Sequence, residues 1–412
     1  MKKTFPGHFP PTNKEVGRLW ESCMFTLDTN ILLNLYRYSD ATRNEFIRVL
    51  KAIKDRLWLP HRVAQEYFEN RLIVVSQQEK AYDEAIKTIK TLQANLSNAR
   101  QHPFLSDKLM QKLTQLLGDV VVELTSTRTT HANRTSSDEI QKAIGDLFNG
   151  RVGPPYSEEQ LETMCKEGED RYVRKVPPGY MDDVKDEPNL SIAANYRKYG
   201  DLIIWRQIIE HSTKVKKGLI FINDDKKEDW WLISHGKTIG PRPELIEEFL
   251  YKTGQSFHMY QADRFLEYAA DFFKQTIAQE SMDEIRDLRK LDMNQAAAML
   301  ARRKEEAMLR EEELRLQAKA SEALLSLEYT RKRMADLRDK ESKIQHGKAV
   351  YQENLDRSGG KDHESLERLI DLTAQAAAIE MEIAKYQDKI MDIEQAHVVA
   401  RNKIAHMQRI IE

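Results

Sequence analysis

The feature that most restricts the fold of this chain is a seven-residue repeat of apolar side chains near its C-terminal end. Between residues 366 and 411, two series of positions spaced seven apart hold apolar or aromatic side chains, with His397 as the polar exception. This spacing is typical of α-helices that pack together along a continuous seam. The series are Leu369, Ala376, Ile383, Ile390, His397, Ile404 and Ile411, and Leu372, Ile379, Tyr386, Ile393, Ala400 and Met407.

A looser repeat upstream supplies a partner helix. Its apolar positions are Leu309, Leu316, Ala320, Ala323, Leu327, Met334, Leu337 and Ile344. Residues 356–362 separate the two repeats and contain Gly359 and Gly360, and paired glycines end helices readily. We therefore predict that residues 279–412 form an antiparallel coiled-coil hairpin that joins copies of the chain or binds a partner protein.

Composition changes near residue 280. All 5 tryptophans and all 12 prolines precede it, whereas the helix-forming residues Glu, Lys, Arg, Ala, Leu and Met dominate after it. Before this point, apolar runs at residues 23–28, 56–60, 218–224 and 256–261 predict strands, and the segments between them predict helices. Residues 1–278 are therefore predicted to form a layered α/β domain around a mainly parallel sheet.

A long insertion interrupts this pattern at about residues 79–198. Its first part, residues 79–122, has the periodicity of amphipathic helices, whereas the Ser/Thr-rich residues 125–137 predict an exposed loop. Asp138 is in a position to start a short helix. Residues 153–183 contain two pairs of prolines and are expected to be irregular.

Charge and motif content exclude several classes of protein. The net charge is −2, so the chain is not a generally basic nucleic-acid binder, although a local basic patch remains compatible with it. No run reaches the roughly 18 apolar residues of a membrane span, and the N-terminus lacks the apolar core of a secretory signal. With Cys23 and Cys165 as the only cysteines, a disulfide framework is excluded and a reducing cytoplasm is the expected location.

No common catalytic motif is present. The 11 histidines show no zinc-binding spacing, and no nucleophile elbow of the Ser hydrolases occurs. Residues 235–238 (HGKT) resemble the end of a phosphate-binding loop, but Trp231 stands where the first glycine of that motif is required.

Acidic residues occur where the predicted strands end and the helices begin. They are, in chain order, Asp28, Glu66, Asp201, Asp224 and Asp225. Because the carboxyl ends of the strands in an open α/β sheet line one crevice, we expect these side chains to converge. Clustered carboxylates repel one another and favour a divalent cation, and oxygen ligands favour Mg²⁺ or Mn²⁺. These ions can ionise water and stabilise a reacting phosphodiester.

Each acid also has a simpler interpretation when it is taken alone. Asp28 is compatible with a helix cap, and Asp201 with an acid that complements a helix dipole. Glu66 lies one helical turn after Arg62 and is able to pair with it. The occurrence of all of them at successive strand ends favours a common site.

Four segments resemble the PIN-like nuclease superfamily when they are taken in order. They are FTLDTNILLNLYRY, LPHRVAQEYFENR, YGDLIIW and LIFINDDKKEDWW, and VPPGYMDD and GPRPELIEEF resemble a bacterial branch of it. The resemblance covers about residues 15–278. It implies a Mg²⁺- or Mn²⁺-dependent phosphodiesterase that cuts single-stranded or structured RNA, or in some cases DNA.

The resemblance also assigns roles to residues. Asp28 corresponds to the central metal ligand, Glu66 to the second acid and Asp201 to the third. Asp225 aligns best with the fourth, Asp224 is an additional acid and candidate, and Asn223 replaces the usual hydroxyl residue. Asn30 corresponds to a polar residue that orients the first acid.

Basic and aromatic side chains near the acids are candidates for substrate binding. The substrate-binding candidates are Asn30, Arg62, Lys226 and Lys227. The two lysines follow the acids directly and are placed to meet phosphate oxygens, although a solvated surface pair is an equally good interpretation of them. Trp230 and Trp231 are compatible with base stacking, but core packing is the simpler interpretation.

Two functions remain open from the sequence. The first is an active nuclease, expected from the resemblance to be a toxin or an antiviral defence effector whose hairpin assembles copies or recruits a partner. The second is a catalytically silent PIN-like scaffold that acts through its coiled coil.

Overall fold

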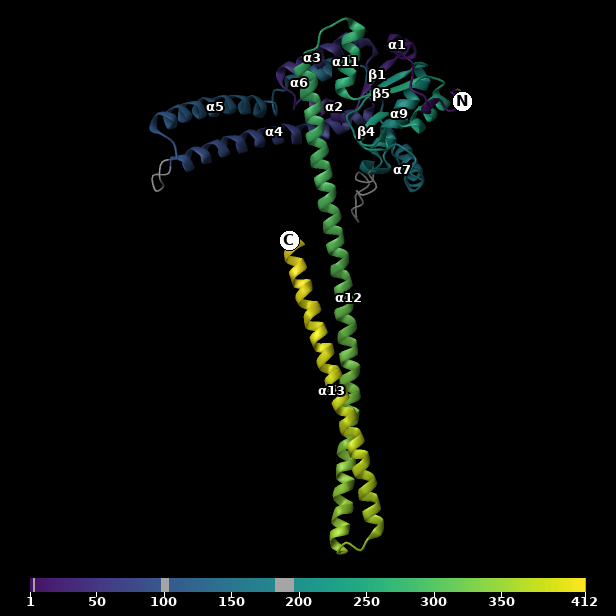
Figure 1. The fold of residues 1–412 in the computed structure, drawn as a ribbon. Coiled ribbons are helices and arrows are strands. Elements are labelled where there is room, and N and C mark those ends of the chain that lie inside the picture. Colours follow the sequence, from purple (N-terminus) through teal and green to yellow (C-terminus); the bar gives the residue numbers. More distant parts are fainter. Residues whose placement is uncertain (3, 98–103, 182–195, 412) are drawn as a thin grey trace. The chain divides into compact units, whose positions relative to one another are not determined.

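The computed structural model describes residues 1–2, 4–97, 104–181 and 196–411. The chain divides into two compact units, Met1–Met293 and Asn294–Glu412 (Figure 1). Within the described residues, no helix contains an apolar stretch long enough to cross a membrane. Asp182 and Asp183 of the VPPGYMDD segment lie outside the described residues.

A three-stranded parallel sheet forms the centre of the first unit. Its strands are β1 (Met24–Leu27), β2 (Leu219–Ile222) and β5 (Phe257–Tyr260), in the order β1-β2-β5. Leu27 pairs with Ile222, which pairs with Tyr260, so the three strands end at the same level. All of β2 is buried, as expected for a central strand covered on both faces. The carboxyl ends of β1 and β2 therefore form a common edge where side chains from the two following loops meet.

The strand predicted at residues 56–60 does not form as a continuous strand. Only isolated bridges form there, between Phe25 and Leu57 and between Leu59 and Val152. The 3₁₀-helix η2 (Lys54–Arg56) occupies the start of this segment and Pro60 ends it, so too few extended residues remain for a strand. An antiparallel hairpin of β3 (Trp231–Ser234) and β4 (Lys237–Pro241) forms where no strand was predicted.

Amphipathic helices cover the sheet and supply the core. They are α1 (Asn13–Ser22), α2 (Thr29–Asn34), α3 (Asp40–Ala52), α9 (Gly200–Val215), α10 (Pro243–Thr253) and α11 (Ala262–Phe273), with the 3₁₀-helix η1 (Pro6–His8) near the N-terminus. Trp20, Trp205 and Phe265 are among the largest fully buried side chains. Residues Gln279–Met293, the first part of α12 (Gln279–Arg357), also belong to this unit and bury Ile285 in its core.

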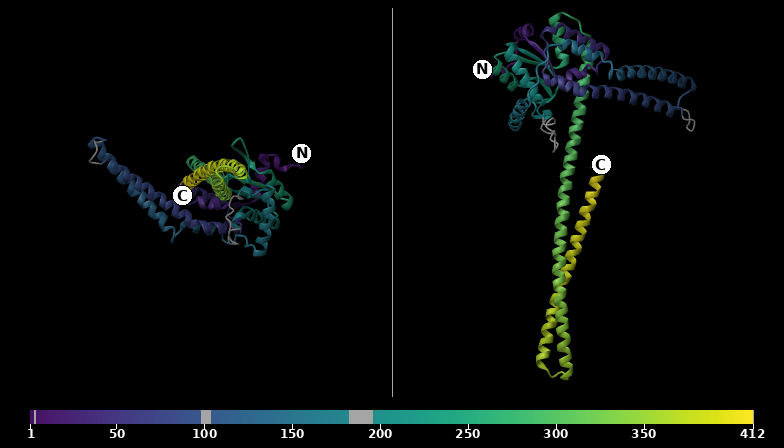
Figure 2. Two further views of the ribbon diagram at one scale, coloured as in Figure 1. Left: turned by 90° about the horizontal axis from the view of Figure 1, so that it is seen from below. Right: turned by 180° about the vertical axis from the view of Figure 1, so that it is seen from behind.

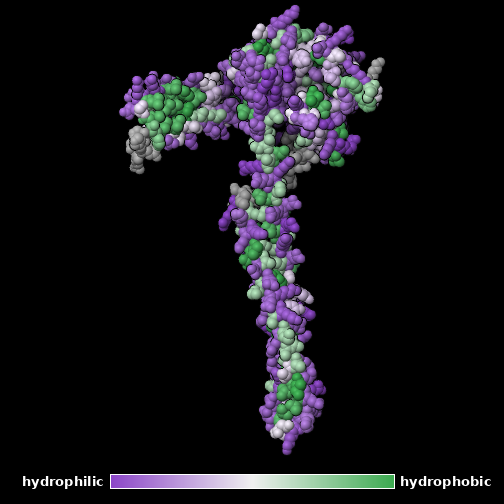
Figure 3. Space-filling model, viewed as in Figure 1, coloured by the Kyte–Doolittle hydropathy of each residue, from purple (hydrophilic) through white to green (hydrophobic). Residues whose placement is uncertain are grey.

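The insertion is more helical than predicted. Helices α4 (His61–Leu96) and α5 (Asp107–Asn133) lie side by side as a hairpin, and α6 (Glu139–Phe148) and α7 (Glu158–Val173) follow (Figure 1). Apolar side chains gather on one exposed face of the α4–α5 hairpin (Figure 3). Among the apolar residues of α5, Leu116 and Val122 are exposed. Asp138 caps α6 as predicted, through the backbone N–H groups of Ile140 and Gln141.

The loop predicted at residues 125–137 is wrong for most of its length, because α5 continues to Asn133. The hydroxyl groups of Thr125 and Thr129 donate hydrogen bonds to the carbonyl oxygens four residues earlier. Arg128 forms ion pairs with Glu79 and Asp83 of α4. Ser and Thr therefore satisfy their hydroxyls inside the helix rather than ending it.

The second unit consists of the remainder of α12 and of α13 (His363–Ile411), which pack antiparallel over the segment near their connecting turn (Figure 2). On α13, every predicted seam position from Leu369 to Met407 is buried or half-buried, whereas the positions between them are exposed. Thr330 fills the α12 seam position between Ala323 and Leu337 and is fully buried. The predicted fold class, a parallel-sheet domain followed by a long helical hairpin, is confirmed.

Candidate active site

Asp28 lies at the common edge of the sheet, directly after β1. Its N–H donates to the carbonyl oxygen of Ile222, which extends the β1–β2 ladder by one bond. Asp28 occupies the N-cap position of α2, but its side chain makes no capping hydrogen bond. The carboxylate is therefore not used as a helix cap, which removes the simplest alternative interpretation of this residue.

Asn30 links the loops that follow β1 and β2. Its Nδ2 donates to Asp28 and also to Asn223 Oδ1, at 2.9 Å, and its Oδ1 accepts the N–H of Asp224 at 3.2 Å. Asn30 thus contacts Asp28 directly, and the orienting role that the resemblance implies for it stays a prediction.

Glu66 reaches the site from the second turn of α4. Its Oε1 accepts a hydrogen bond from Arg62 Nε at 2.8 Å, and its Oε2 accepts one from Thr29 Oγ1 at 2.9 Å. A Cβ atom at Gly200 would lie only 2.8 Å from Glu66 Oε1. A glycine at the start of α9 therefore allows Glu66 to approach the helix that carries Asp201.

Asp201 lies in the first turn of α9. Its Oδ2 accepts a hydrogen bond from Trp230 Nε1 at 3.2 Å and lies 3.6 Å from Lys227 Nζ. On another side, Gly179 has a positive φ of 92°, and a Cβ there would lie 3.1 Å from Asp201 Cβ. The Pro-Pro-Gly part of the VPPGYMDD segment therefore forms a wall of the site beside Asp201.

Asp229 holds that wall in place, a role for which the sequence contained no direct signal. The side chain is fully buried, and its Oδ2 accepts the N–H groups of Gly179 at 2.9 Å and Met181 at 3.1 Å. Asp229 lies beyond the end of the predicted strand at residues 218–224. Only the acidic character of the DDKKED segment pointed toward it.

Asp225 completes the group from the loop after β2. Its N–H donates to Asn223 Oδ1 at 2.6 Å, and its Oδ1 accepts the N–H groups of Lys226 and Lys227. Its Oδ2 lies 3.3 Å from Lys227 Nζ. The ammonium group of Lys227 therefore lies between Asp201 and Asp225 and balances part of their charge.

The charges of these side chains act on one another. Burial raises the pKa of Asp28 well above its ordinary value, and the charges of Asp201, Glu66 and Asp225 raise it further. Carboxylates from α4, α9 and the loop after β2 thus act on the carboxyl group that follows β1. The structure brings together Asp28, Glu66, Asp201 and Asp225.

Asp224 lies apart from this group. Its Oδ1 accepts the N–H of Ala262, the first residue of α11, at 2.9 Å and pairs with Arg289 Nη1 at 3.1 Å. Arg289 also pairs with Asp263 at 2.7 Å. Asp224 therefore joins β2 to α11 and to the start of α12, and neither Arg289 nor this connection was expected from the sequence.

The lysines and tryptophans near the acids differ in whether their side chains are accessible at the site. Lys226 is half-buried, its Nζ has no hydrogen-bond partner among the described residues, and burial lowers its pKa to about 8. Lys227 instead contacts two of the acids. Trp230 and Trp231 are 1% and 3% exposed, so they pack in the core and are not available for base stacking.

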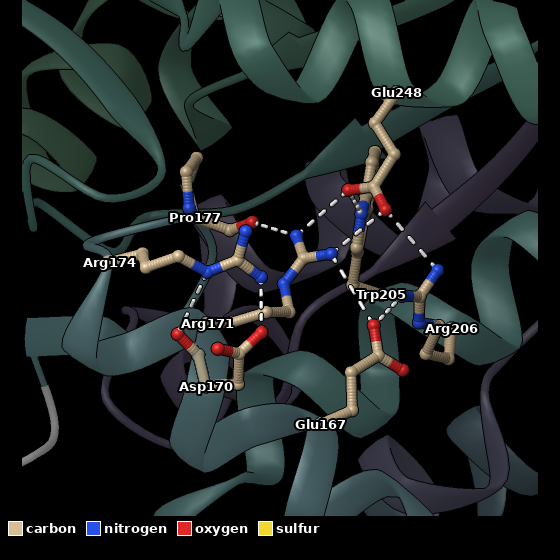
Figure 4. A network of polar contacts seen from close by, with 8 residues as sticks. All are labelled: Glu167, Asp170, Arg171, Arg174, Pro177, Trp205, Arg206 and Glu248. Atoms are coloured by element: carbon tan, nitrogen blue, oxygen red, sulfur yellow. Dashed lines mark hydrogen bonds and ion pairs between the residues drawn. The ribbon is translucent and has the colours of Figure 1, made fainter.

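A buried ion-pair network fixes the helix that carries Asp201 (Figure 4). Glu248 of α10 accepts hydrogen bonds from both terminal nitrogens of Arg171 at 2.9 Å, from Trp205 Nε1 at 2.9 Å and from Arg206 Nη1 at 3.2 Å. Arg171 also donates to the carbonyl oxygen of Pro177. The network thus connects α7, α9, α10 and the Pro-Pro-Gly wall.

The donor chemistry of the site fits a hard divalent cation. The converging side chains offer only oxygen ligands, and the repulsion between neighbouring carboxylates is the kind that a bound cation relieves. The side chains are not arranged as a finished metal site, however. In the described part of the chain, no group of three or more His, Cys, Asp or Glu side chains is close enough to hold an ion.

Comparison with known proteins agrees with this geometry. A family model described as a PIN like domain matches residues 24–245, which is more than half of the 412-residue chain. No curated protein and no solved structure matched the chain. The matched stretch runs from β1 into α10 and contains Asp28, Glu66, Asp201 and Asp225. The chain therefore belongs to the PIN-like domain family.

Proposed function

We propose that this protein is an endonuclease that hydrolyses phosphodiester bonds with Mg²⁺ or Mn²⁺, and that its preferred substrate is RNA, single-stranded or tRNA-like. Domains of this family are generally nucleases and bind nucleic acid. The observation that carries the proposal is the set of contacts at one edge of the sheet: Asn30 bonds Asp28, its neighbour Thr29 bonds Glu66, and Lys227 Nζ lies within 3.6 Å of Asp201 and 3.3 Å of Asp225. These acids come from distant parts of the sequence, and a shared cation gives their convergence a chemical purpose.

In this proposal Asp28, Glu66, Asp201 and Asp225 hold the cation, and Asp224 does not. The chemistry that a bound divalent cation supplies is ionisation of a water molecule and stabilisation of charge on the phosphodiester oxygens. Asn30 and Thr29 orient Asp28 and Glu66 through their hydrogen bonds. Asp229 keeps the Pro-Pro-Gly wall against Asp201.

Lys227 and Arg62 are the basic groups proposed to contact substrate. Lys227 Nζ lies between two of the acids, so its ammonium group is at the proposed site and would meet a phosphate bound there. Arg62 is largely buried and already pairs with Glu66, and we propose that its guanidinium acts mainly by fixing that carboxylate. Lys226 points into the protein and is not proposed to bind substrate.

The Asp28→Asn variant tests the proposal. We expect it to cut labelled RNA roughly 100-fold more slowly than the wild type in Mn²⁺, because a neutral amide is a much weaker ligand than a carboxylate. Asp55→Asn is the matched control, since Asp55 is a highly exposed acid that contacts only Arg151 among the described residues. Labelled single-stranded DNA run in parallel decides between RNA and DNA, and EDTA gives the metal-free rate.

Equal cleavage by Asp28→Asn and by the wild type would contradict the proposal, as would cleavage that EDTA leaves unchanged. If neither protein cuts RNA or DNA, the alternative function is favoured.

The alternative is a PIN-like scaffold without catalytic activity. One observation favours it: Arg62 and Lys227 already neutralise part of the acidic group, so charge balance does not strictly require a metal ion. A scaffold would act through the helices of residues 279–412.

The biological role proposed from the family resemblance is that of a toxin or an antiviral defence effector. We further propose that residues 279–412 join copies of the chain and thereby control its activity. Sequencing the RNA and DNA fragments that appear in cells on induction, with Asp28→Asn as the control, would identify the substrate.

A further inference from the structure

Helix α13 carries a second apolar stripe in addition to the seam that contacts α12. The stripe consists of one side chain in every seven, each one position after a seam residue, and its members are Ile370, Ala377, Ala384, Met391, Val398 and Ala405. All are exposed, with Ile370, Met391 and Val398 at 62%, 63% and 54%. At 1.5 Å per residue, the stripe is roughly 50 Å long.

The stripe is not a by-product of helix composition. On α12, the positions directly after Ala320, Leu327 and Met334 are Ser321, Glu328 and Ala335, and the same seven-residue column continues with Leu314, Ser342 and Ala349. Half of those positions are polar, as expected for a solvated face, whereas the α13 column has no polar member. A strict apolar heptad column on an exposed face is the pattern of a second helix-packing surface.

The sizes of the side chains favour a second copy of the same helix, running antiparallel. Two antiparallel copies of α13 can be related by a two-fold axis that passes between residues 387 and 388. In this register, Ile370 of one copy lies opposite Ala405 of the second copy. In the same register Ala377 lies opposite Val398 of the second copy, and Ala384 opposite Met391 of the second copy. A large side chain thus meets a small one at every level, which fills space evenly. A parallel pair would instead place Ile370 against itself and Ala377 against itself.

Charges beside the stripe agree with the same register. Lys385 falls within one helical turn of Asp392 of the second copy, and Asp371 within one turn of His406 of the second copy. The two-fold symmetry produces each of these pairs twice. One pair is unfavourable, because Asp388 lies near the two-fold axis and meets its own copy. The two symmetry-related Lys385–Asp392 pairs therefore outnumber this single like-charge contact.

We propose that this protein forms a dimer in which the outer stripe of α13 packs antiparallel on the same stripe of a second copy, with the two-fold axis near Asp388. The dimer gives a definite structure to the assembly role proposed above for residues 279–412. It does not depend on nuclease activity.

Light scattering on the full-length protein tests the interface. The double variant Met391→Glu/Val398→Glu places charges on the stripe without touching the α12 seam. We expect the dimer dissociation constant to rise roughly 100-fold or more, because two buried apolar side chains are lost from each copy. Leu325→Glu is the matched control, since Leu325 is 69% exposed but lies on α12. Light scattering on this variant should still give the mass of a dimer.

Helical circular dichroism that matches the wild type would show that the double variant still folds. A wild type that is monomeric at micromolar concentration would overturn the proposal. A double variant that remains as dimeric as the wild type would overturn it too, since the contact would then lie elsewhere.

Cysteine cross-linking tests the direction. In a Cys165→Ser background, oxidation of Ala384→Cys mixed with Met391→Cys should give a disulfide-linked dimer of the two different chains, because those positions face each other in the antiparallel register. Ala384→Cys alone should link poorly, since the two copies of this position are about 10 Å apart along the axis. Efficient linking by Ala384→Cys alone, with none in the mixture, would mean a parallel pair and overturn the proposal.

Asp388→Asn provides a test in the opposite sense. Removal of the like-charge contact near the axis should tighten the dimer severalfold at low salt, and less at high salt. An unchanged or weaker dimer would overturn the placement of the axis.

Cleavage of RNA by Met391→Glu/Val398→Glu separates the two proposals: a monomer that still cuts RNA leaves the nuclease proposal intact, and an inactive dimer leaves the interface intact.

Discussion

At the scale of single residues, Asp28 shows how the fold creates an unusual carboxyl group. The end of β1 places it among three other acids, and its own helix does not use it as a cap. Asn30 holds its orientation from two positions away. A side chain that is half-buried, oriented by a hydrogen bond and repelled by its neighbours is suited to binding a cation and poorly suited to a purely structural role.

The difference between Asp224 and Asp225 marks a limit of sequence-based reasoning at this scale. Both acids follow β2, and the sequence left open which of them joins the group. In extended backbone, adjacent side chains point to opposite sides, so a shift of one residue exchanges their roles. The register of β2 against β5 and the position of Arg289 decide the matter, and neither can be deduced from the local sequence.

His211 gives a pH-dependent prediction. Its ring stacks on Trp58 with centroids 3.9 Å apart, and burial lowers its pKa to about 4. The folded protein therefore binds a proton less readily at His211 than the unfolded chain, whose value is about 6.5. The neutral His211 ring therefore contributes to the free energy of unfolding. This contribution is fully present above about pH 6.5 and is lost as the pH falls toward 4.

Urea unfolding at about pH 7.5 and pH 5 measures this effect. His211→Phe keeps the aromatic contact but cannot titrate, so the wild type should lose on the order of 2 kcal/mol more than the variant over this interval. Equal losses would show that His211 is not held in its neutral form.

At the scale of secondary structure elements, the start of α12 is fastened to the α/β unit by buried ion pairs. Arg289 contacts Asp224 and Asp263, and Arg286 contacts Asp263 at 2.8 Å. The Arg289→Ala variant would leave two buried carboxylates without this partner. We expect the free energy of unfolding to fall by about 3 to 5 kcal/mol, measured by urea denaturation.

A matched control variant separates the loss of a buried ion pair from the loss of an exposed one. Arg302 lies on the same helix, is 83% exposed and pairs only with Glu306 among the described residues. Arg302→Ala should therefore cost less than about 1 kcal/mol. A loss for Arg289→Ala no larger than that would contradict the fastening role.

The elements differ in how well the sequence predicted them. The α13 seam was predicted position by position, because a heptad repeat is a local signal repeated many times. The loop predicted at residues 125–137 failed because composition alone did not reveal that Arg128 pairs with α4. The β3–β4 hairpin was not predicted, because its turn residues, His235 and Gly236, carry no typical turn dipeptide and lie in the HGKT segment, which resembles the end of a phosphate-binding loop. Both turn residues have positive φ, as a two-residue hairpin turn requires.

At the scale of the whole molecule, the chain consists of a PIN-like unit and a helical unit that share α12. The division at Met293 and Asn294 falls later than the predicted domain boundary at residue 278. Residues 279–293 contribute Met282 and Ile285 to the core of the first unit, as well as Arg286 and Arg289 to its ion pairs.

Two truncations test where the first unit ends. A protein of residues 1–293 should fold and be monomeric by light scattering, because it keeps these contacts and loses the helical hairpin. A protein of residues 1–284 should unfold at a lower urea concentration or aggregate, because it lacks Ile285, Arg286 and Arg289. Equal stability of the two would contradict the assignment of residues 285–293 to the PIN-like unit.

The central claim is that Asp28, Glu66, Asp201 and Asp225 form one pocket for a divalent cation, and titration of the full-length protein with Mn²⁺ by calorimetry tests it most directly. We predict saturable binding to the wild type and to Asp55→Asn, and affinity at least about tenfold weaker for Asp28→Asn. Lys227→Met should bind severalfold more tightly, because it removes the ammonium group between Asp201 and Asp225. Binding to Asp28→Asn that equals the wild type, or no binding to any of the proteins, would contradict the claim.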